Sequence, residues 1–431
     1  MSDRAGTFGL FRDREFVALA GTAFARSQAY STILIALALY ADLYGTTGFI
    51  EGMFGTAFAI VQLFIVLPLG RYVDTGNAKR FILAGLAVNV LVFVGFIFVG
   101  NPVHIIFVRI LQGIGASILW ITGSTVVGEI SPDDRRGRWL GSYNQVAAFS
   151  SLAGDLVGGY LLYEYGFTFT YVILTGITIA AFGLVYSFLR NNPGGRKDPE
   201  EATGVETLRS LLSLPTIRAL VGFRLGFSFG KMAVIIFLPI YARVEFGMEA
   251  FEIGWILAGG KLTKSLFQGI MGDLTDRLGR KHWFVASGAL LYGLGTALIP
   301  FADMAATAVP TVTLAAIGQS VTLTGPFLTL FAAYSVLGIA DSLRLPASMA
   351  MFVEEGERYD SVASSFSLRS IAWKVGQIAG PVSVGVIKDQ VGTFAAFWTA
   401  AGFILVATVA FLWLYSRGHA AEDVRPALAD D

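Results

Sequence analysis

Cysteine is absent from this sequence, and charged residues are scarce. The absence of cysteine excludes disulfides, thiol chemistry and cysteine-ligated metal sites. Only 14% of the 431 residues are charged, against about 25% in an average soluble domain. Histidine occurs three times, at His104, His282 and His419, too far apart along the chain to suggest a metal cluster. We therefore predict no cofactor and no metal.

Net charge and hydrophobic content narrow the class of protein further. A formal net charge of zero argues against nucleic acid as a partner. Hydrophobic residues make up 55% of the chain, which is more than the core of a soluble protein would hide, so a lipid bilayer is the expected solvent. The 50 glycines fit this class, because glycine lets membrane helices approach one another closely.

Long apolar runs recur along the chain at the length that a membrane-spanning helix needs, about 20 residues. They are continuous, whereas the strands of a membrane barrel show short alternating segments. The first run, from Phe16 to Tyr40, is too long for the apolar region of a signal peptide. We predict an all-α polytopic membrane protein with twelve spans at 16–42, 48–69, 81–100, 102–128, 139–163, 168–190, 216–242, 252–271, 283–301, 327–353, 362–387 and 393–415.

Basic residues are distributed unevenly between the two sides of these spans. With the N-terminus inside, 19 of the 31 Lys and Arg residues fall in cytoplasmic segments. Arg243 and Lys388 alone fall in outside loops, and the other ten lie at or within spans. Because basic residues favour the cytoplasmic side, we predict a multi-pass protein of the plasma membrane with both termini in the cytoplasm.

A polar segment divides the chain into two halves. Residues 191–214 begin with Asn, Pro and Gly residues, a composition that is typical of a linker, and leave room for a short interfacial helix. We predict an N-terminal six-helix bundle over 1–190, a cytoplasmic linker over 191–214, a C-terminal six-helix bundle over 215–418 and a cytoplasmic tail over 419–431.

One loop motif occurs twice, 202 residues apart. The sequence after the second span is Gly70-Arg-Tyr-Val-Asp74-Thr-Gly-Asn-Ala-Lys79-Arg80. The sequence after the eighth span is Gly272-Asp-Leu-Thr-Asp276-Arg277-Leu-Gly279-Arg280-Lys281. Each copy is Gly-x-x-x-Asp followed by a basic cluster, in a short loop two spans into its half. Such a repeat predicts two related halves.

The repeated motif resembles the G-x-x-x-D-[RK]-x-G-[RK]-[RK] loop of the major facilitator superfamily. The second copy has every fixed residue, whereas the first has Thr75 in place of a base and Asn77 in place of a glycine. In the fourth span, Arg109-Ile-Leu-Gln112-Gly113-Ile-Gly115-Ala116 is similar to the R-x-x-Q-G-x-G-A signature of this family. The resemblance implies two pseudo-symmetric six-helix bundles that transport a solute by alternating access, with the solute site between them.

Two glycine-rich segments, in the fifth and eleventh spans, resemble the G-P-x-x-G-G bend of proton-coupled antiporters in this family. Asp155 stands where the first segment would have its proline. The predicted bend residues are Gly154, Gly158, Gly159, Gly376, Gly380 and Pro381.

The spacing of these motifs locates an insertion. Gly154 and Gly380 are 226 residues apart, 24 more than the two loop motifs. The additional residues must lie after Asp276 and before the eleventh span. We assign them to 303–325 and predict an outside loop or partial helix there, not a thirteenth span.

Charged side chains within the spans are functional candidates, because charge is costly at membrane depth. Basic residues there outnumber acidic ones, which favours an anionic solute; the alternative is that several lysines reach the membrane interface. Asp341 and Arg344 are three residues apart and are expected to neutralise each other. The predicted substrate and proton cavity consists of Arg26, Arg109, Gln112, Asp155, Arg224, Lys231, Lys261 and Lys374.

Asp155 is the candidate for proton coupling, because a carboxyl group in a medium of low dielectric binds a proton more readily. The structural alternative is an aspartate bonded to a neighbouring arginine or to the hydroxyl groups of Ser150 or Ser151. For Arg109, the family resemblance implies a place in or near the central cavity and a part in proton handling; the alternative is packing.

The two loop motifs have a different expected role. Their charged residues can form and break bonds between helices at the cytoplasmic face and so bias the inward-open and outward-open states. Anchoring to the cytoplasmic side is the plainer alternative, and the two are compatible. The predicted gate residues are Gly70, Asp74, Lys79, Arg80, Gly272, Asp276, Arg277, Gly279, Arg280 and Lys281.

The function that these features predict is secondary active transport of a small organic solute, by proton-coupled export. The alternatives are proton- or ion-coupled uptake of an anionic solute and a solute sensor that binds without transport. We expect no enzyme, because no nucleophile–base pair, metal cluster or phosphate loop is evident. The expected partners are the solute, protons and membrane lipid, and the expected state is a monomer.

Overall fold

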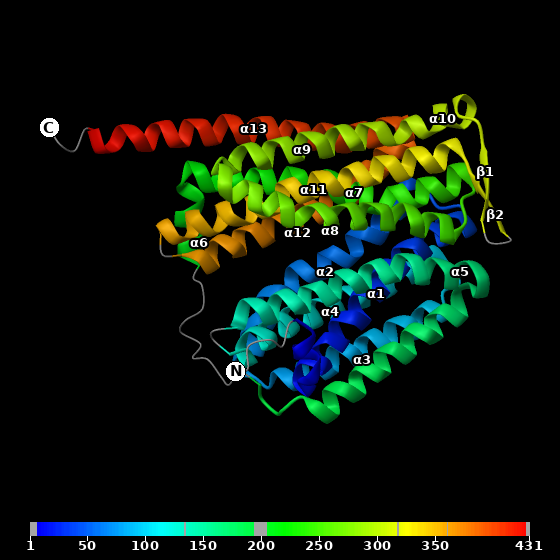
Figure 1. Cartoon of the computed structure of the whole chain (residues 1–431), viewed down its shortest axis with the longest axis horizontal. Coiled ribbons are helices and arrows are strands. Elements are labelled where there is room, and N and C mark those ends of the chain that lie inside the picture. Colours follow the sequence, from blue (N-terminus) through cyan, green and yellow to red (C-terminus); the bar gives the residue numbers. More distant parts are fainter. Residues whose placement is uncertain (1–6, 133–134, 194–204, 317–318, 360, 428–431) are drawn as a thin grey trace. The chain divides into compact units, whose positions relative to one another are not determined.

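The computed structural model describes residues 7–132, 135–193, 205–316, 319–359 and 361–427, and these are helical almost throughout (Figure 1). The chain folds into two compact units. Unit 1 consists of Met1–Thr46, Ala57–Ala202 and Gly247–Trp255, and unit 2 consists of Thr47–Thr56, Thr203–Phe246 and Ile256–Asp431. Most of α2 thus belongs to unit 1 and its first turns to unit 2, whereas α8 begins in unit 1 and continues in unit 2.

The first half of the chain supplies a short 3-10 helix, Thr7–Arg12, and five helices. These are α1 (Arg14–Leu43), α2 (Gly48–Thr75), α3 (Ala78–Ile97), α4 (Pro102–Ile130) and α5 (Arg136–Phe188). The second half supplies α6 (Val205–Ser213), α7 (Pro215–Phe246), α8 (Ala250–Leu278), α9 (Lys281–Leu298), α10 (Ala302–Ala308), α11 (Gly325–Arg358), α12 (Val362–Val391) and α13 (Thr393–Ala427).

Helix α5 covers two of the predicted spans. Its 53 residues would measure about 80 Å if straight, far more than the roughly 30 Å of a bilayer core. The helix turns at Gly166, whose φ of 72° is readily adopted by glycine but costly for other residues. With α5 counted as two, the described residues contain twelve long helical segments, and the predicted all-α fold class is confirmed.

Eight of the long helices are apolar enough to cross a membrane by length and composition alone, counted over the described residues. Helices α1, α8 and α12 fall outside this group. Each of them carries charge in its interior, such as Arg26 in α1, Lys261 in α8 and Lys374 in α12. The helices with the weakest hydropathy are therefore ones that hold candidate functional residues.

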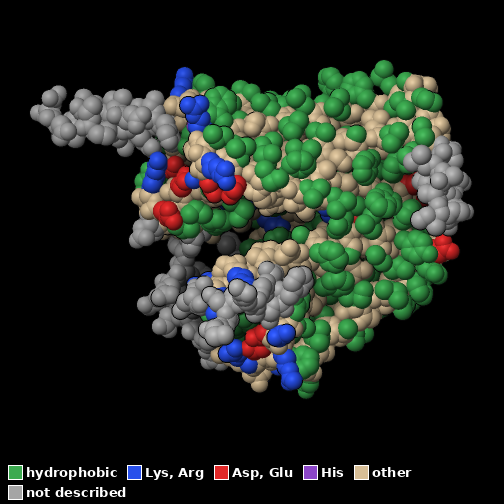
Figure 2. Space-filling model, in the orientation of Figure 1, with side chains coloured by type: hydrophobic (Ala, Val, Ile, Leu, Met, Phe, Trp, Pro, Cys, Tyr) green, Lys and Arg blue, Asp and Glu red, His purple; other side chains and the backbone are tan. Residues whose placement is uncertain are grey.

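The flanks of the helices are hydrophobic. Figure 2 shows apolar side chains over much of the visible flank of each unit, with Lys, Arg, Asp and Glu gathered toward helix ends. Phe64 and Phe98 are 73% and 75% exposed. Large apolar side chains at such exposure suit contact with lipid.

The segment 303–325, for which the sequence predicts an outside loop or partial helix, contains α10 and a β-hairpin. Strands β1 (Val312–Ala316) and β2 (Gln319–Leu323) pair antiparallel, from Val312 opposite Leu323 to Ala316 opposite Gln319. The strands were not expected from the sequence. Their physical basis is the run of Val and Thr residues, whose branched side chains favour extended backbone.

Two further segments bear on the predicted boundaries. Helix α6 lies within the predicted linker and packs its leucines, Leu208 and Leu211, against Ile217 of α7 and Leu368 of α12. Helix α13 runs on to Ala427, through most of the segment predicted as a tail. The Ala, Glu and Arg residues of that segment are good helix formers and extend α13 without interruption.

In unit 1, an ion pair joins the start of α1 to the end of α5. The Arg190 side chain donates to Glu15 through Nη2 at 2.5 Å and through Nε at 2.9 Å, and the Arg190 backbone N–H donates to the same carboxylate at 2.9 Å. These hydrogen bonds hold the pKa of Glu15 below its ordinary value of 4.5.

Because the folded-state pKa of Glu15 is lowered, its contribution to stability is present above pH 4.5 and is lost as pH falls through the folded value. We predict that Glu15→Gln lowers the free energy of unfolding at pH 7 by up to about 1 kcal/mol, since Arg190 is largely exposed. The difference from wild type should shrink as pH falls below 4.5 and disappear once pH is below the folded-state pKa. Unfolding of the purified protein across this pH range checks it, and a difference that does not change with pH would contradict the assignment.

Candidate functional site

Asp341 is the centre of a buried charge cluster in unit 2. Its Oδ1 accepts a hydrogen bond from Arg344 Nη2 at 2.8 Å, one turn further along α11. Its Oδ2 forms an ion pair with Lys231 of α7 and lies 3.6 Å from Lys264 Nζ of α8. One carboxylate therefore forms ion pairs with three cations, each from a different helix.

Glycines place these helices close enough for the cluster to form. A Cβ on Gly338 of α11 would lie 2.1 Å from the carbonyl oxygen of Gly260 in α8, so the two backbones touch. A Cβ on Gly288 of α9 would lie 2.8 Å from Arg344 Cβ. These contacts bring α8, α9 and α11 together near Asp341.

Aromatic rings hold the guanidinium groups of this region. Arg224 of α7 lies 4.0 Å from the ring centroid of Trp373 in α12, and Arg344 lies 3.9 Å from that of Phe227. Both arginines are buried. A ring face attracts a cation and fixes the plane of the guanidinium group.

Apart from Asp341, every acidic residue of α7, α8, α11 and α12 lies in the first two or the last two turns of its helix. Asp341 alone stands near the middle. The basic residues in the interior of these helices are Arg224, Lys231, Lys261, Lys264, Arg344, Arg369 and Lys374. The interior of unit 2 thus carries an excess of positive charge.

The eight predicted cavity residues divide evenly between the units. Arg224, Lys231, Lys261 and Lys374 lie in unit 2, where Lys231 joins the Asp341 cluster and Lys374 donates to Gln377 Oε1 at 3.1 Å. Arg26, Arg109, Gln112 and Asp155 lie in unit 1.

In unit 1, Arg109 and Gln112 of α4 are buried and bonded to each other. Arg109 Nη1 donates to Gln112 Oε1 at 2.5 Å, and the Arg109 guanidinium lies 4.4 Å from the ring of Phe58. Arg26 of α1 lies 4.8 Å from the ring of Trp120. Arginines of both units are therefore packed against aromatic rings.

Asp155 lies where α5 packs closely against α1 and is fully buried. A Cβ on Gly154 would lie 2.4 Å from the Gln28 carbonyl oxygen in α1, and one on Gly158 would lie 2.0 Å from Thr32 Oγ1. On another side, a Cβ on Gly254 of α8 would lie 2.3 Å from the Asp155 carbonyl oxygen. Asp155 therefore lies at a junction of α1, α5 and the start of α8.

The other predicted bend occupies a corresponding position in unit 2. A Cβ on Gly376 would lie 2.5 Å from the Leu225 carbonyl oxygen, and one on Gly380 would lie 2.1 Å from that of Phe229. Pro381 lies inside α12. The two glycine-rich segments thus share one feature, close contact with the backbone of a neighbouring helix: α5 meets α1, and α12 meets α7. Gly159 makes a similar contact with Ala250.

The second loop motif lies at the junction of α8 and α9. Arg277 Nη2 lies 3.2 Å from Asp273 Oδ2, and Lys281 forms an ion pair with Glu354 of α11. Gly279 makes the turn, with a φ of 65°. Gly272, Asp276 and Arg280 belong to the same segment, in which Asp276 and Arg280 are exposed.

The first loop motif is only partly described. For Gly70 and Asp74 only the helical backbone is among the described features. Lys79 donates to the carbonyl oxygens of Tyr186 and Leu189 at 2.9 and 2.6 Å, where a cation neutralises the negative end of α5. Arg80 is exposed.

The structure adds a second acidic and basic cluster, within unit 2, that was not among the predicted site residues. Lys388 Nζ near the end of α12 donates to Glu51 Oε2 at 2.7 Å, and Asp389 accepts from the N–H groups of Gly48 and Phe49 at 2.6 and 2.8 Å. Its sequence signal, an acid at a helix start and a Lys–Asp pair at a helix end, is too common to single out.

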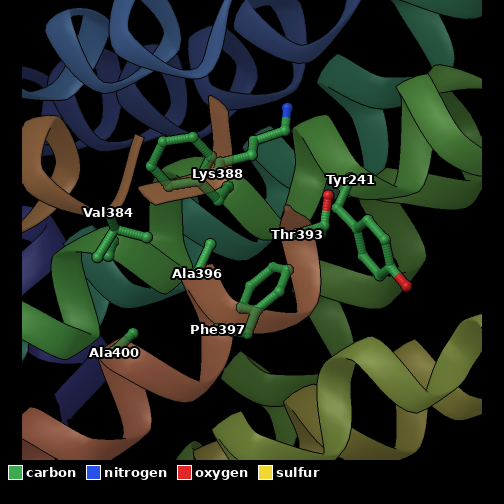
Figure 3. A pocket seen from close by; sticks show the side chains of 9 residues that line it. Tyr241, Val384, Lys388, Thr393, Ala396, Phe397 and Ala400 are labelled. Atoms are coloured by element: carbon green, nitrogen blue, oxygen red, sulfur yellow. The ribbon is translucent and has the colours of Figure 1, made fainter. Parts of the chain in front are cut away.

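A small pocket adjoins this second cluster. Figure 3 shows Val384, Ala396 and Phe397 around it, with the amine of Lys388 pointing away from Ala396 and Phe397. Its lining is mostly apolar and aromatic, with Tyr241 at one side. Because this pocket is small and mostly apolar, the charged Asp341 cluster is the stronger candidate site.

Comparison with known proteins gives a consistent result. The model of the Major Facilitator Superfamily matches residues 19–249 and 220–429. The uncharacterized MFS-type transporter YuxJ of Bacillus subtilis is 24% identical over 91% of this chain and 95% of that protein. The multidrug resistance protein MdtG of Dickeya zeae is 24% identical over 91% of this chain and 92% of that protein.

Among solved structures, a bacterial homolog of the human lysosomal transporter Spinster, in an inward-facing and unoccupied conformation, has the same fold. The TM-score is 0.71 at 14% identity, over 97% of this chain and 98% of that chain. The predicted fold and the predicted family resemblance are confirmed.

Removing the shared carboxylate tests whether the Asp341 cluster is buried. Asp341→Asn leaves Lys231, Lys264 and Arg344 without their shared carboxylate, and breaking a buried pair typically costs about 3–5 kcal/mol. We expect a loss of stability of that size, measured by unfolding in detergent. The control is Asp273→Asn, which removes an exposed partner of Arg277 and should change stability by less than about 1 kcal/mol. Equal effects of the two substitutions would argue against a buried cluster.

Proposed function

Because the chain belongs to the Major Facilitator Superfamily, whose relatives here are named as transporters, we propose that it moves a small organic solute across the membrane by proton-coupled alternating access. That the chain is a multi-pass membrane transporter follows from its family. Proton coupling, the direction of transport and the class of solute are the proposal.

The observation that carries proton coupling is Asp155, a fully buried carboxyl group between helices that pack through glycine. A carboxyl group removed from water is costly to keep charged, so it binds a proton when its surroundings dehydrate and releases it when water returns. Alternating access supplies that change of surroundings. Arg109 and Gln112, which are buried in the same unit and bonded to each other, keep a fixed positive charge in that unit without carrying the proton themselves.

Two observations favour export. The glycine-rich segments at Gly154 and Gly376 resemble the bend of antiporters in this family, and the structure places each of them against a neighbouring helix. The relative MdtG is named as a multidrug resistance protein. A proton entering the cell in exchange for the solute is the corresponding mechanism.

The family and the distribution of basic residues also support a proposal for the arrangement in the membrane. We propose a plasma-membrane protein with both termini in the cytoplasm, with bundles over 1–190 and 215–418 and a linker over 191–214. Lys281 and its pair with Glu354 belong to the cytoplasmic gate, together with Asp276. The protein is expected to act as a monomer in lipid.

A second candidate is proton- or ion-coupled uptake of an anionic solute. The observation that favours it is the excess of positive charge in the middle of α7, α8, α11 and α12. Asp341 alone does not balance this positive charge, and the charge that remains attracts an anion.

The test is flux into proteoliposomes with an imposed pH gradient, followed with a proton-sensitive dye inside the vesicles while candidate solutes are added. We predict that Asp155→Asn lowers pH-driven transport at least about 10-fold, because a proton-transfer group of this kind contributes about 10²–10⁴-fold to a rate. Exchange of solute for solute at equal pH should survive, which separates coupling from folding. The control is Glu164→Gln, an exposed acid on the same helix.

Three outcomes would count against the proposal. Solute flux that continues unchanged when the pH gradient is collapsed rules out proton coupling. Intact pH-driven flux in Asp155→Asn removes Asp155 from the mechanism. Solute binding without flux in any condition favours a sensor.

A further inference from the structure

Two arginines in unit 2 each have two hydrogen-bond donors that no acceptor satisfies among the described residues, whereas Arg369 has one, its Nε. The two are Arg224 of α7 and Arg344 of α11, and in each the Nε and Nη1 atoms are buried without a partner. Arg224 is 7% exposed and Arg344 is 1% exposed. A buried cation with unsatisfied donors is costly, and native proteins rarely keep one without a reason.

Neither guanidinium group is free to turn toward water. Trp373 lies against Arg224 at 4.0 Å and Phe227 lies against Arg344 at 3.9 Å. Asp341 also holds Arg344 through Nη2, at 2.8 Å. The unsatisfied donors are therefore on side chains that aromatic rings and one carboxylate already hold in place.

The charges of this region repel one another. Arg224 experiences repulsion from both Arg344 and Arg369, and Arg369 experiences repulsion from Arg344, so the three arginines share one neighbourhood. Asp341 is the nearby carboxylate, but it is already shared with Lys231 and Lys264. The neighbourhood retains uncompensated positive charge.

We propose that Arg224 and Arg344 form a binding site for one oxyanion group of the solute, a carboxylate, sulfonate or phosphonate, with Arg369 adding its charge. This inference rests on the proposed transport function and names the class of its solute. An oxyanion accepts several hydrogen bonds at once, as guanidinium groups require, and charge-assisted bonds of this kind are about twice as strong as neutral ones. Trp373 and Phe227 offer apolar surface beside the anionic group, so an aromatic or aliphatic acid fits better than inorganic phosphate.

The experiment measures binding by isothermal titration to the full chain in detergent, at constant ionic strength. The probes are phenylphosphonate, benzenesulfonate and benzoate, with phenyltrimethylammonium as the cation of similar size. We expect at least one of the three anions to bind and the cation not to bind. Arg224→Gln and Arg344→Gln should each weaken anion binding at least about 10-fold, the loss expected when one charged hydrogen-bonding partner of a buried ligand is removed.

Matched variants separate binding from folding. Arg417→Gln removes an exposed arginine that also lies against a tryptophan, Trp413, at 3.9 Å, and should leave binding unchanged. Arg224→Lys keeps the charge and loses the planar donors, so it should fold as wild type does and bind the anion more weakly than wild type but more tightly than Arg224→Gln.

Binding of the cation in place of the anions would overturn the proposal, as would anion binding that is equal in wild type and in both Gln variants. Failure of all three anions to bind would do the same. If pH-driven flux that depends on Asp155 persists in that case, the oxyanion site is wrong and the transporter proposal stands; if neither is found, both fail.

Discussion

The ion pairs of Asp341 are the constraint on which the interior of unit 2 depends. A carboxylate in the middle of a membrane helix is tolerated only when it is paired, and here it is paired with Lys231, Lys264 and Arg344 from α7, α8 and α11. The same pairs make three interior cations tolerable. Each helix is thereby held to the others by charge as well as by packing.

Close backbone packing makes this arrangement possible. Where Gly260 meets Gly338, and where Gly288 meets Arg344, the helices approach until a single added carbon would clash. The same device operates in unit 1, where Gly154 and Gly158 bring α5 onto α1 and enclose Asp155. Glycine thus places the buried charges of each unit, and the positive charge that remains in unit 2 is available to a solute.

The sequence predicted the fold well, because its signals are local. Apolar runs and their length depend on neighbouring residues alone, and the repeated loop motif at Gly70 and Gly272 identified the family. The separation of the fifth and sixth spans near Gly166 follows from the same local pattern. The hairpin at Val312–Leu323 was missed because a partly apolar segment rich in Thr suits several conformations.

The candidate site was harder to predict, because it depends on which helix faces meet. The pair of Asp341 with Arg344 could be inferred, since the two residues are one helical turn apart. Its pairs with Lys231 and Lys264 join residues far apart in the sequence, and no periodicity in one chain shows that α7 and α8 turn those faces toward α11. Lys374, which was also predicted for the cavity, donates to Gln377 three residues further along the same helix, a pair that helical spacing makes possible.

The most direct test of this account is a double-mutant cycle on Lys231 and Asp341, with the free energy of unfolding measured in detergent for Lys231→Met, Asp341→Asn and the double variant. If one shared carboxylate holds the helices of unit 2 together, the double variant should lose less stability than the sum of the two single losses, by about 1 kcal/mol or more. Strictly additive losses would contradict it, because they would show that the two residues stabilise the protein independently.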